Sequence, residues 1–96
     1  MRNVMTGLVN LMEETVLEKI DQLWKETDYC KCERCKMDIA AYALNRLPPK
    51  YVQSLEGKML HKFVTHTTQT DVEITAVVYK GIQIVGAEPH KNSNVY

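Results

Sequence analysis

The chain has 96 residues, 45% hydrophobic and 25% charged, which predicts one small globular domain and excludes a multidomain enzyme or a disordered chain. Its 12 lysines and arginines balance its 12 aspartates and glutamates, so the net charge makes no strong case for binding DNA. A domain of this size needs support from a metal, a disulfide or a partner subunit. Without a secretory signal or an apolar run near the ~20 residues that span a bilayer, we expect a cytoplasmic protein that binds no membrane.

The first predicted element is a long amphipathic helix within residues 1–26. From Val4 to Trp24 apolar residues recur at spacings of three or four, as on one face of a helix. Four further apolar residues (Val4, Met5, Leu11 and Leu17) widen this stripe. A wide stripe indicates a second copy of the chain, and we expect a homodimer. Alternatively, the extra residues cap a small bundle within one chain.

Two further segments follow. Residues 27–36 break the periodicity with charged residues around three cysteines, and this predicts a metal-binding loop. A second helix is predicted over residues 35–47, because alanines favour helix and Pro48 and Pro49 end it. Residues 51–56 predict a loop.

Residues 58–86 are expected to form the C-terminal helical part, with a short helix over 58–64. The stretch Thr70–Glu73 has the spacing of a capping box and predicts that the last helix starts there. Residues 72–85 also alternate in part like a strand, which is the competing interpretation. Residues 87–96 are expected to form a frayed tail. The expected fold is therefore all-α, with about four helices and a Cys-rich loop in a single domain over residues 1–96.

Cys30, Cys32 and Cys35 form a C-x-C-x2-C cluster. An odd number of cysteines in a short stretch suits metal binding better than a secreted disulfide framework. Zinc takes thiolates in tetrahedral geometry, and a structural site would supply folding free energy. The sequence therefore predicts a structural Zn²⁺ ion. The cations Lys31, Arg34 and Lys36 are placed to offset its net negative charge.

A fourth zinc ligand is not evident from the cysteines. We favour His66 slightly over Asp38. His61 and His90 are further candidates, and His90 falls in the expected tail. A second interpretation is a thiol redox sensor, in which Cys32 and Cys35 form a dithiol that Cys30 could resolve. The sequence has no Gly-rich phosphate loop and no arrangement of a nucleophile with a base, so we expect a non-enzymatic protein.

A set of motifs covering about half of the chain resembles the late competence development protein ComFB family. They are Asn3-Val4-Met5, the cysteine cluster, Asp38-Ile39, Ala43-Leu44-Asn45 and Leu47-Pro48-Pro49-x-Tyr51-Val52. The resemblance implies a small, helical, dimeric, zinc-binding protein of the bacterial cytoplasm, associated with competence for DNA uptake. Relatives in other bacteria are described as receptors for cyclic dinucleotides.

Two functions remain in view. The first is a regulatory or scaffold protein of competence that acts through a protein partner, and we favour it. The second is a receptor for a cyclic dinucleotide (c-di-GMP or c-di-AMP), bound by Arg46, Lys50 and Tyr51. In that case Tyr51 stacks on a base and the two cations hold a phosphate. Alternatively, Tyr51 packs into the bundle and the cations are solvated.

Overall fold

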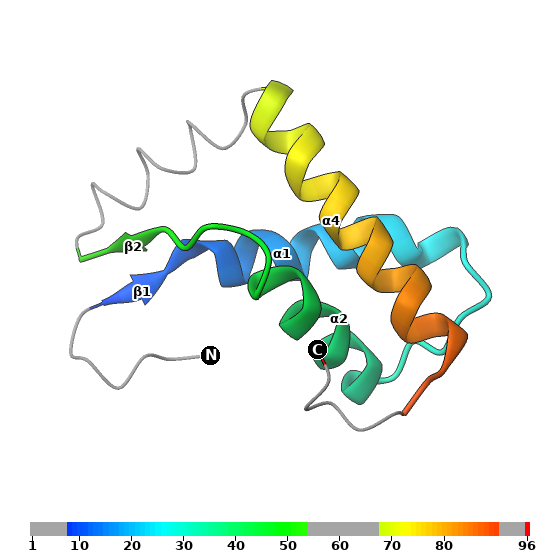
Figure 1. Ribbon diagram of the computed structural model, residues 1–96. Coiled ribbons are helices and arrows are strands. Elements are labelled where there is room, and N and C mark those ends of the chain that lie inside the picture. The colour runs from blue at the N-terminus through cyan, green and yellow to red at the C-terminus, as the bar shows by residue number, and fades with distance from the viewer. Residues whose placement is uncertain (1–7, 54–67, 91–95) are drawn as a thin grey trace.

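Three α-helices and two very short strands form the part of the chain that the computed structural model describes, residues 8–53, 68–90 and 96. The helices are α1 (Leu11–Leu23), α2 (Glu33–Leu44) and α4 (Thr68–Ala87), and the 3-10 turn η1 (Trp24–Glu26) follows α1. Strands β1 (Val9–Asn10) and β2 (Tyr51–Val52) pair antiparallel. Figure 1 shows α4 crossing α1 and running beside α2, with the strand pair beyond the start of α1. The fold is thus mostly helical, with a small sheet that the all-α prediction did not include.

The first helix begins later than predicted, because Asn10 caps it. The side-chain oxygen of Asn10 accepts hydrogen bonds from the backbone N–H groups of Met12, at 3.1 Å, and Lys50, at 2.8 Å. The first bond satisfies a donor at the start of α1, and the second holds the chain just before β2. Residues 9 and 10 are therefore strand rather than helix, and residues 51 and 52 are strand rather than loop.

The other two helices also differ from prediction at their ends. α2 spans Glu33–Leu44 instead of 35–47, because the Sγ atom of Cys32 accepts a hydrogen bond from the N–H of Cys35 and caps the helix earlier. α4 starts at Thr68, so the expected capping residue Thr70 lies inside the helix. Residues 72–85 are helical, which excludes the strand interpretation. The helix predicted over 58–64 lies outside the described residues.

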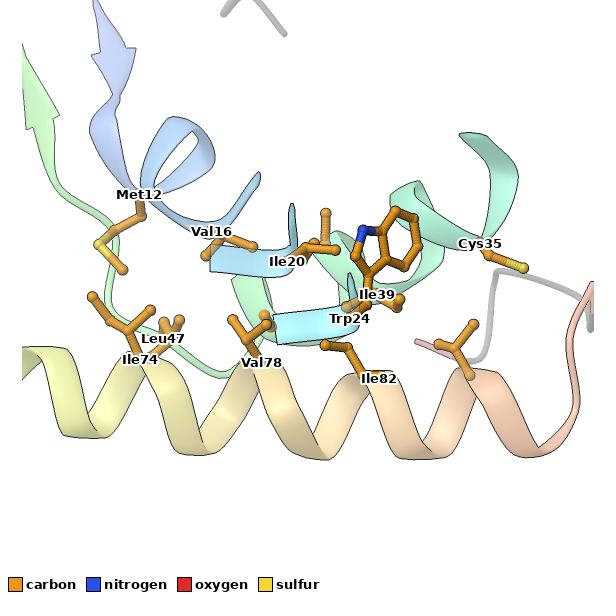
Figure 2. Close-up of a cluster of buried hydrophobic side chains, with 13 residues drawn as sticks. Met12, Val16, Ile20, Trp24, Cys35, Ile39, Leu47, Ile74, Val78 and Ile82 are labelled. Atoms are coloured by element: carbon orange, nitrogen blue, oxygen red, sulfur yellow. The ribbon is translucent and has the colours of Figure 1, made fainter. Parts of the chain in front are cut away.

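One hydrophobic core fills the space between the three helices (Figure 2). Val16 and Ile20 of α1, Ile39 of α2 and Val78 of α4 are at most 2% exposed. Leu17 and Leu23 are partly buried and pack against the same cluster. Most of the apolar stripe of α1 is therefore used within a single chain, as in the small-bundle interpretation.

Two ion pairs link the helices at the surface. Lys19 of α1 lies 2.7 Å from the carboxylate of Asp71 in α4, and Lys36 of α2 lies 2.9 Å from that of Asp21 in α1. Both acids are more than half exposed, and exposed pairs contribute only about 0–1 kcal/mol. The apolar core therefore dominates the stability. None of the helices in the described ranges combines the length and the apolar character that a membrane crossing needs.

Candidate metal centre

The three cysteines lie where the irregular segment after η1 enters α2. Cys30 and Cys32 are partly buried, and Cys35, on the first turn of α2, is 1% exposed and belongs to the core cluster. The hydrogen bond from the N–H of Cys35 to Cys32 Sγ, at 3.4 Å, turns the two sulfur atoms toward the same point. The helix start itself therefore positions two of the three thiols. Figure 2 shows Cys35 at the edge of the core.

A histidine from the other end of the chain completes the group. His90 follows α4, and its Nε2 atom lies 3.2 Å from Cys32 Sγ and 3.5 Å from Cys30 Sγ. The guanidinium group of Arg34 donates a hydrogen bond to the carbonyl oxygen of His90, at 2.9 Å, which holds its backbone in place. In Figure 1 the segment that leads into α2 lies beside the C-terminal end of α4. Four potential ligands from two distant parts of the chain thus meet.

The geometry of this group fits a tetrahedral metal ion. The three Sγ atoms and the imidazole nitrogen all lie within 4.8 Å of one another. A zinc–sulfur distance of about 2.3 Å and a zinc–nitrogen distance of about 2.0 Å place tetrahedral ligand atoms roughly 3.5–3.8 Å apart. To reach these separations, the longest distances in the group would shorten by up to about 1 Å, and the 3.2 Å between Cys32 Sγ and His90 Nε2 would lengthen slightly. Soft thiolate and imidazole ligands of this kind also favour zinc over harder divalent ions such as Mg²⁺ and Ca²⁺.

The two neighbouring thiols of the cluster differ in acidity. The backbone hydrogen bond from Cys35, followed by the hydrogen bond with His90, lowers the pKa of Cys32 to about 6. Burial raises the pKa of Cys35 to about 12, and hydrogen bonds with the other two cysteines add to this rise. At neutral pH without metal, Cys32 is therefore mostly thiolate and Cys35 mostly thiol.

We expect the apparent zinc affinity to rise at least about tenfold between pH 7 and pH 8. Cys35 keeps its proton over this range, because its pKa is about 12, and it must lose that proton to bind a metal ion as thiolate. Cys32 adds no further dependence, because its pKa is about 6. Isothermal titration calorimetry in buffers of different ionisation enthalpy counts the protons released. A zinc affinity that stays constant over this range would contradict ligation by the Cys35 thiolate.

The family model of the late competence development protein ComFB matches residues 9–89. The chain belongs to the ComFB family. Among solved structures, it is similar to the late competence protein ComFB from Bacillus subtilis, with 24% sequence identity and a TM-score of 0.78. The similarity covers 88% of this chain and 93% of that chain, so the two share their fold. No curated protein matches the sequence.

The predicted candidates for the fourth ligand of this ComFB-family domain have different positions. His61 and His66 lie outside the described residues, which leaves the preference for His66 untested. Asp38 lies on α2, is 2% exposed and is not part of the group of four. Its Oδ2 atom has no hydrogen-bond partner among the described residues. The structure instead brings in His90, a candidate that was not preferred because it falls in the expected tail.

The residues predicted to bind a nucleotide in this ComFB-family domain have separate surroundings. Arg46 stacks on the ring of Tyr42, with its guanidinium carbon 3.8 Å from the ring centre, and donates to the Tyr42 carbonyl oxygen. Lys50 lines a cavity of about 100 Å³ between the start of α4 and the turn after α2, which neither Arg46 nor Tyr51 lines. Tyr51 is 54% exposed on β2. Neither cavity described within residues 8–53 and 68–90 is lined by all three side chains.

A close contact between α4 and the cysteine segment sets the position of this site. A Cβ atom added at Gly86 would lie 2.4–2.6 Å from three ring carbons of Tyr29, so only glycine allows the approach seen here. Tyr29 immediately precedes Cys30, and Gly86 lies four residues before His90. This contact could not be predicted, because Gly86 and its neighbours Val85 and Ala87 form no recognisable sequence motif.

Proposed function

We propose that this ComFB-family protein is a non-enzymatic regulatory or scaffold protein of bacterial competence, stabilised by a structural zinc ion. Cys30, Cys32, Cys35 and His90 would hold the ion. One observation carries the proposal: three thiols and an imidazole, from two segments far apart in the sequence, have their ligand atoms within 4.8 Å of one another. Membership of a family named for late competence development supports the biological setting.

A structural rather than a catalytic role follows from the number and origin of the ligands. Four protein ligands fill a tetrahedral zinc ion and leave no position for water or substrate. The ion would connect the start of α2 to the chain after α4, and these two helices share the core. Metal binding would thus close the domain and add the stabilisation that a small core lacks.

We further propose that the protein acts in the cytoplasm as a homodimer that binds a competence-related protein. The outer face of α4 supports an interaction role, because Val72 is 60% exposed and Tyr79 is 49% exposed. These residues are seven apart and therefore lie on the same side of the helix. Native mass spectrometry of protein purified without added metal reports the subunit number and the bound metal together. A metal-free monomer would contradict both the structural zinc ion and the homodimer.

His90→Asn tests the proposed zinc ligands directly. Asparagine tolerates the positive φ of 68° at this position, so the chain path is kept while the imidazole is lost. We expect the zinc affinity to fall by at least about 100-fold, since the loss of even an outer-shell partner of a metal site costs about 10–100-fold. Competition with a chromophoric zinc chelator measures this change.

Asp38→Asn is the matched control for this experiment. Asp38 is another candidate ligand and lies three residues after Cys35 on α2. Like His90→Asn, the substitution puts an amide side chain in its place, and we expect unchanged zinc affinity. A loss of affinity in Asp38→Asn with none in His90→Asn would assign the fourth ligand to Asp38. Equal affinity in both variants and the parent would exclude both residues. Adding cyclic dinucleotides to the native mass experiment tests the receptor function, for which a bound nucleotide would be the positive result.

A further inference from the structure

Tyr96, six residues after His90, contacts the C-terminal end of α2. The backbone oxygen of Tyr96 accepts hydrogen bonds from Asn45 Nδ2, at 2.9 Å, and from Arg46 Nη1, at 3.2 Å. Tyr96 is partly buried and packs against the hydrophobic core cluster. A single residue thus combines a polar anchor with an apolar one.

One of the two donors has contacts that do not involve Tyr96. The Arg46 guanidinium group lies over the Tyr42 ring and donates to the Tyr42 carbonyl oxygen, at 2.9 Å. Asn45 is the C-cap of α2, and its backbone N–H bonds to Ala41 and Ala43, so its side chain is not needed to end the helix. The Arg46 donor therefore loses little conformational entropy when it binds the Tyr96 oxygen.

The same stretch of chain therefore contacts both ends of α2. His90 meets the cysteines at the start of the helix, and Tyr96 meets Asn45 and Arg46 at its end. The helix has 12 residues, a length of about 18 Å. Six residue steps from His90 to Tyr96 reach at most about 20 Å, which is enough for both anchors to be occupied at once.

We propose that Asn45 and Arg46 form a docking site for Tyr96, and that metal binding at His90 strengthens the docking. Fixing one end of a short tether raises the effective concentration of the other end at its site. Because the coupling is reciprocal, a docked Tyr96 raises the metal affinity by the same factor by which metal favours docking. The coupling rests on the proposed metal centre, whereas the docking site itself does not.

The docking site is tested by amide exchange at the Asn45 side chain in Tyr96→Ala. Nuclear magnetic resonance resolves this NH₂ group, and its signal is assigned from its disappearance in Asn45→Ala. Tyr96→Ala keeps the backbone oxygen but removes the side chain that packs against the core. Without this apolar anchor the bond from Asn45 to the oxygen should form less often, so we expect the Asn45 amide hydrogens to exchange with water at least about tenfold faster than in the parent. Unchanged exchange would overturn the docking site, whether or not the protein binds zinc.

The coupling is tested by zinc affinity in Asn45→Ala and Tyr96→Ala. We expect both variants to bind zinc about 5–10-fold more weakly than the parent, in the range typical of coupling between sites. Val9→Ala shortens an exposed side chain of β1, at the opposite end of α1 from the cysteine segment (Figure 1), and serves as the control with unchanged affinity. Parent affinity in both variants would overturn the coupling. A parent protein that binds no zinc would overturn it too, together with the proposed function, and the exchange experiment would still decide the docking.

Discussion

Chelation of zinc is expected to lower the melting temperature of the domain by roughly 15–30 °C. When free zinc exceeds its dissociation constant a thousandfold, binding to the folded state alone adds about 4 kcal/mol to the free energy of unfolding. In a domain of this size each kcal/mol corresponds to about 4–8 °C. Circular dichroism at 222 nm during heating, with and without a strong chelator, measures the shift.

Cys30→Ser separates the metal from the core in this experiment, because Cys30 is only partly buried whereas Cys35 belongs to the core itself. Serine is close in size to cysteine but is a poor zinc ligand, so the variant should melt at the temperature of the chelated parent. Adding chelator to the variant should produce no further shift. If the chelator does not change the melting curve of the parent protein, the structural zinc ion is contradicted. A disulfide formed by mild oxidation would then favour the thiol redox sensor.

Gly86→Ala is expected to lower the free energy of unfolding by about 1–3 kcal/mol and to weaken zinc binding. Elsewhere in a helix the same change stabilises by about 1 kcal/mol, because alanine has the higher helix propensity. Here the new Cβ atom would lie 2.4–2.6 Å from Tyr29 ring carbons, including the ring's attachment point, so the whole side chain has to move. Since Cys30 follows directly, its sulfur atom would move away from His90. Chemical denaturation and zinc competition measure the two effects.

The double variant Gly86→Ala with Tyr29→Ala tests the cause. If the clash with the ring is responsible, removing the ring should restore zinc affinity, and the two substitutions should be strongly non-additive. Additive losses would show that Gly86 acts through something other than Tyr29. Gly81→Ala is a useful comparison, because the new Cβ atom would come within 3.0 Å of only one atom, a ring carbon of Tyr42.

The helices could be predicted from the sequence because their apolar spacing is local. Each described helix overlaps a predicted one: α1 lies inside its predicted segment, α2 starts two residues early, at Glu33, and α4 ends one residue late, at Ala87. The polarity of residues 27–36 marked the break between the first two helices. Their ends were less predictable. Asn10 with Glu13 three residues later is itself a start signal for a helix, but the apolar residues Val4 and Val9 extended the periodic pattern across it. Strands of two residues are too short to show a period.

Only the part of the candidate site that is formed by the three cysteines could be predicted from the sequence. The spacing of the three cysteines is sufficient to suggest one metal ion, since neighbouring residues cannot lie far apart. The contribution of His90 depends on where α4 ends relative to α2, which in turn depends on a 20-residue helix and on the close approach at Gly86. Neither distance is encoded in a short motif. The docking of Tyr96 was missed for the same reason.

The backbone of His90 limits which residues this position accepts. Its φ of 68° lies in the left-handed region, where histidine, asparagine, aspartate and glycine are tolerated much better than other residues. Of the side chains with a strong zinc-binding atom, cysteine is the softer donor but would occupy this conformation at a cost of about 1–3 kcal/mol. Imidazole and carboxylate ligands are thus compatible with the chain path, whereas a fourth thiolate would require the turn after α4 to be rebuilt.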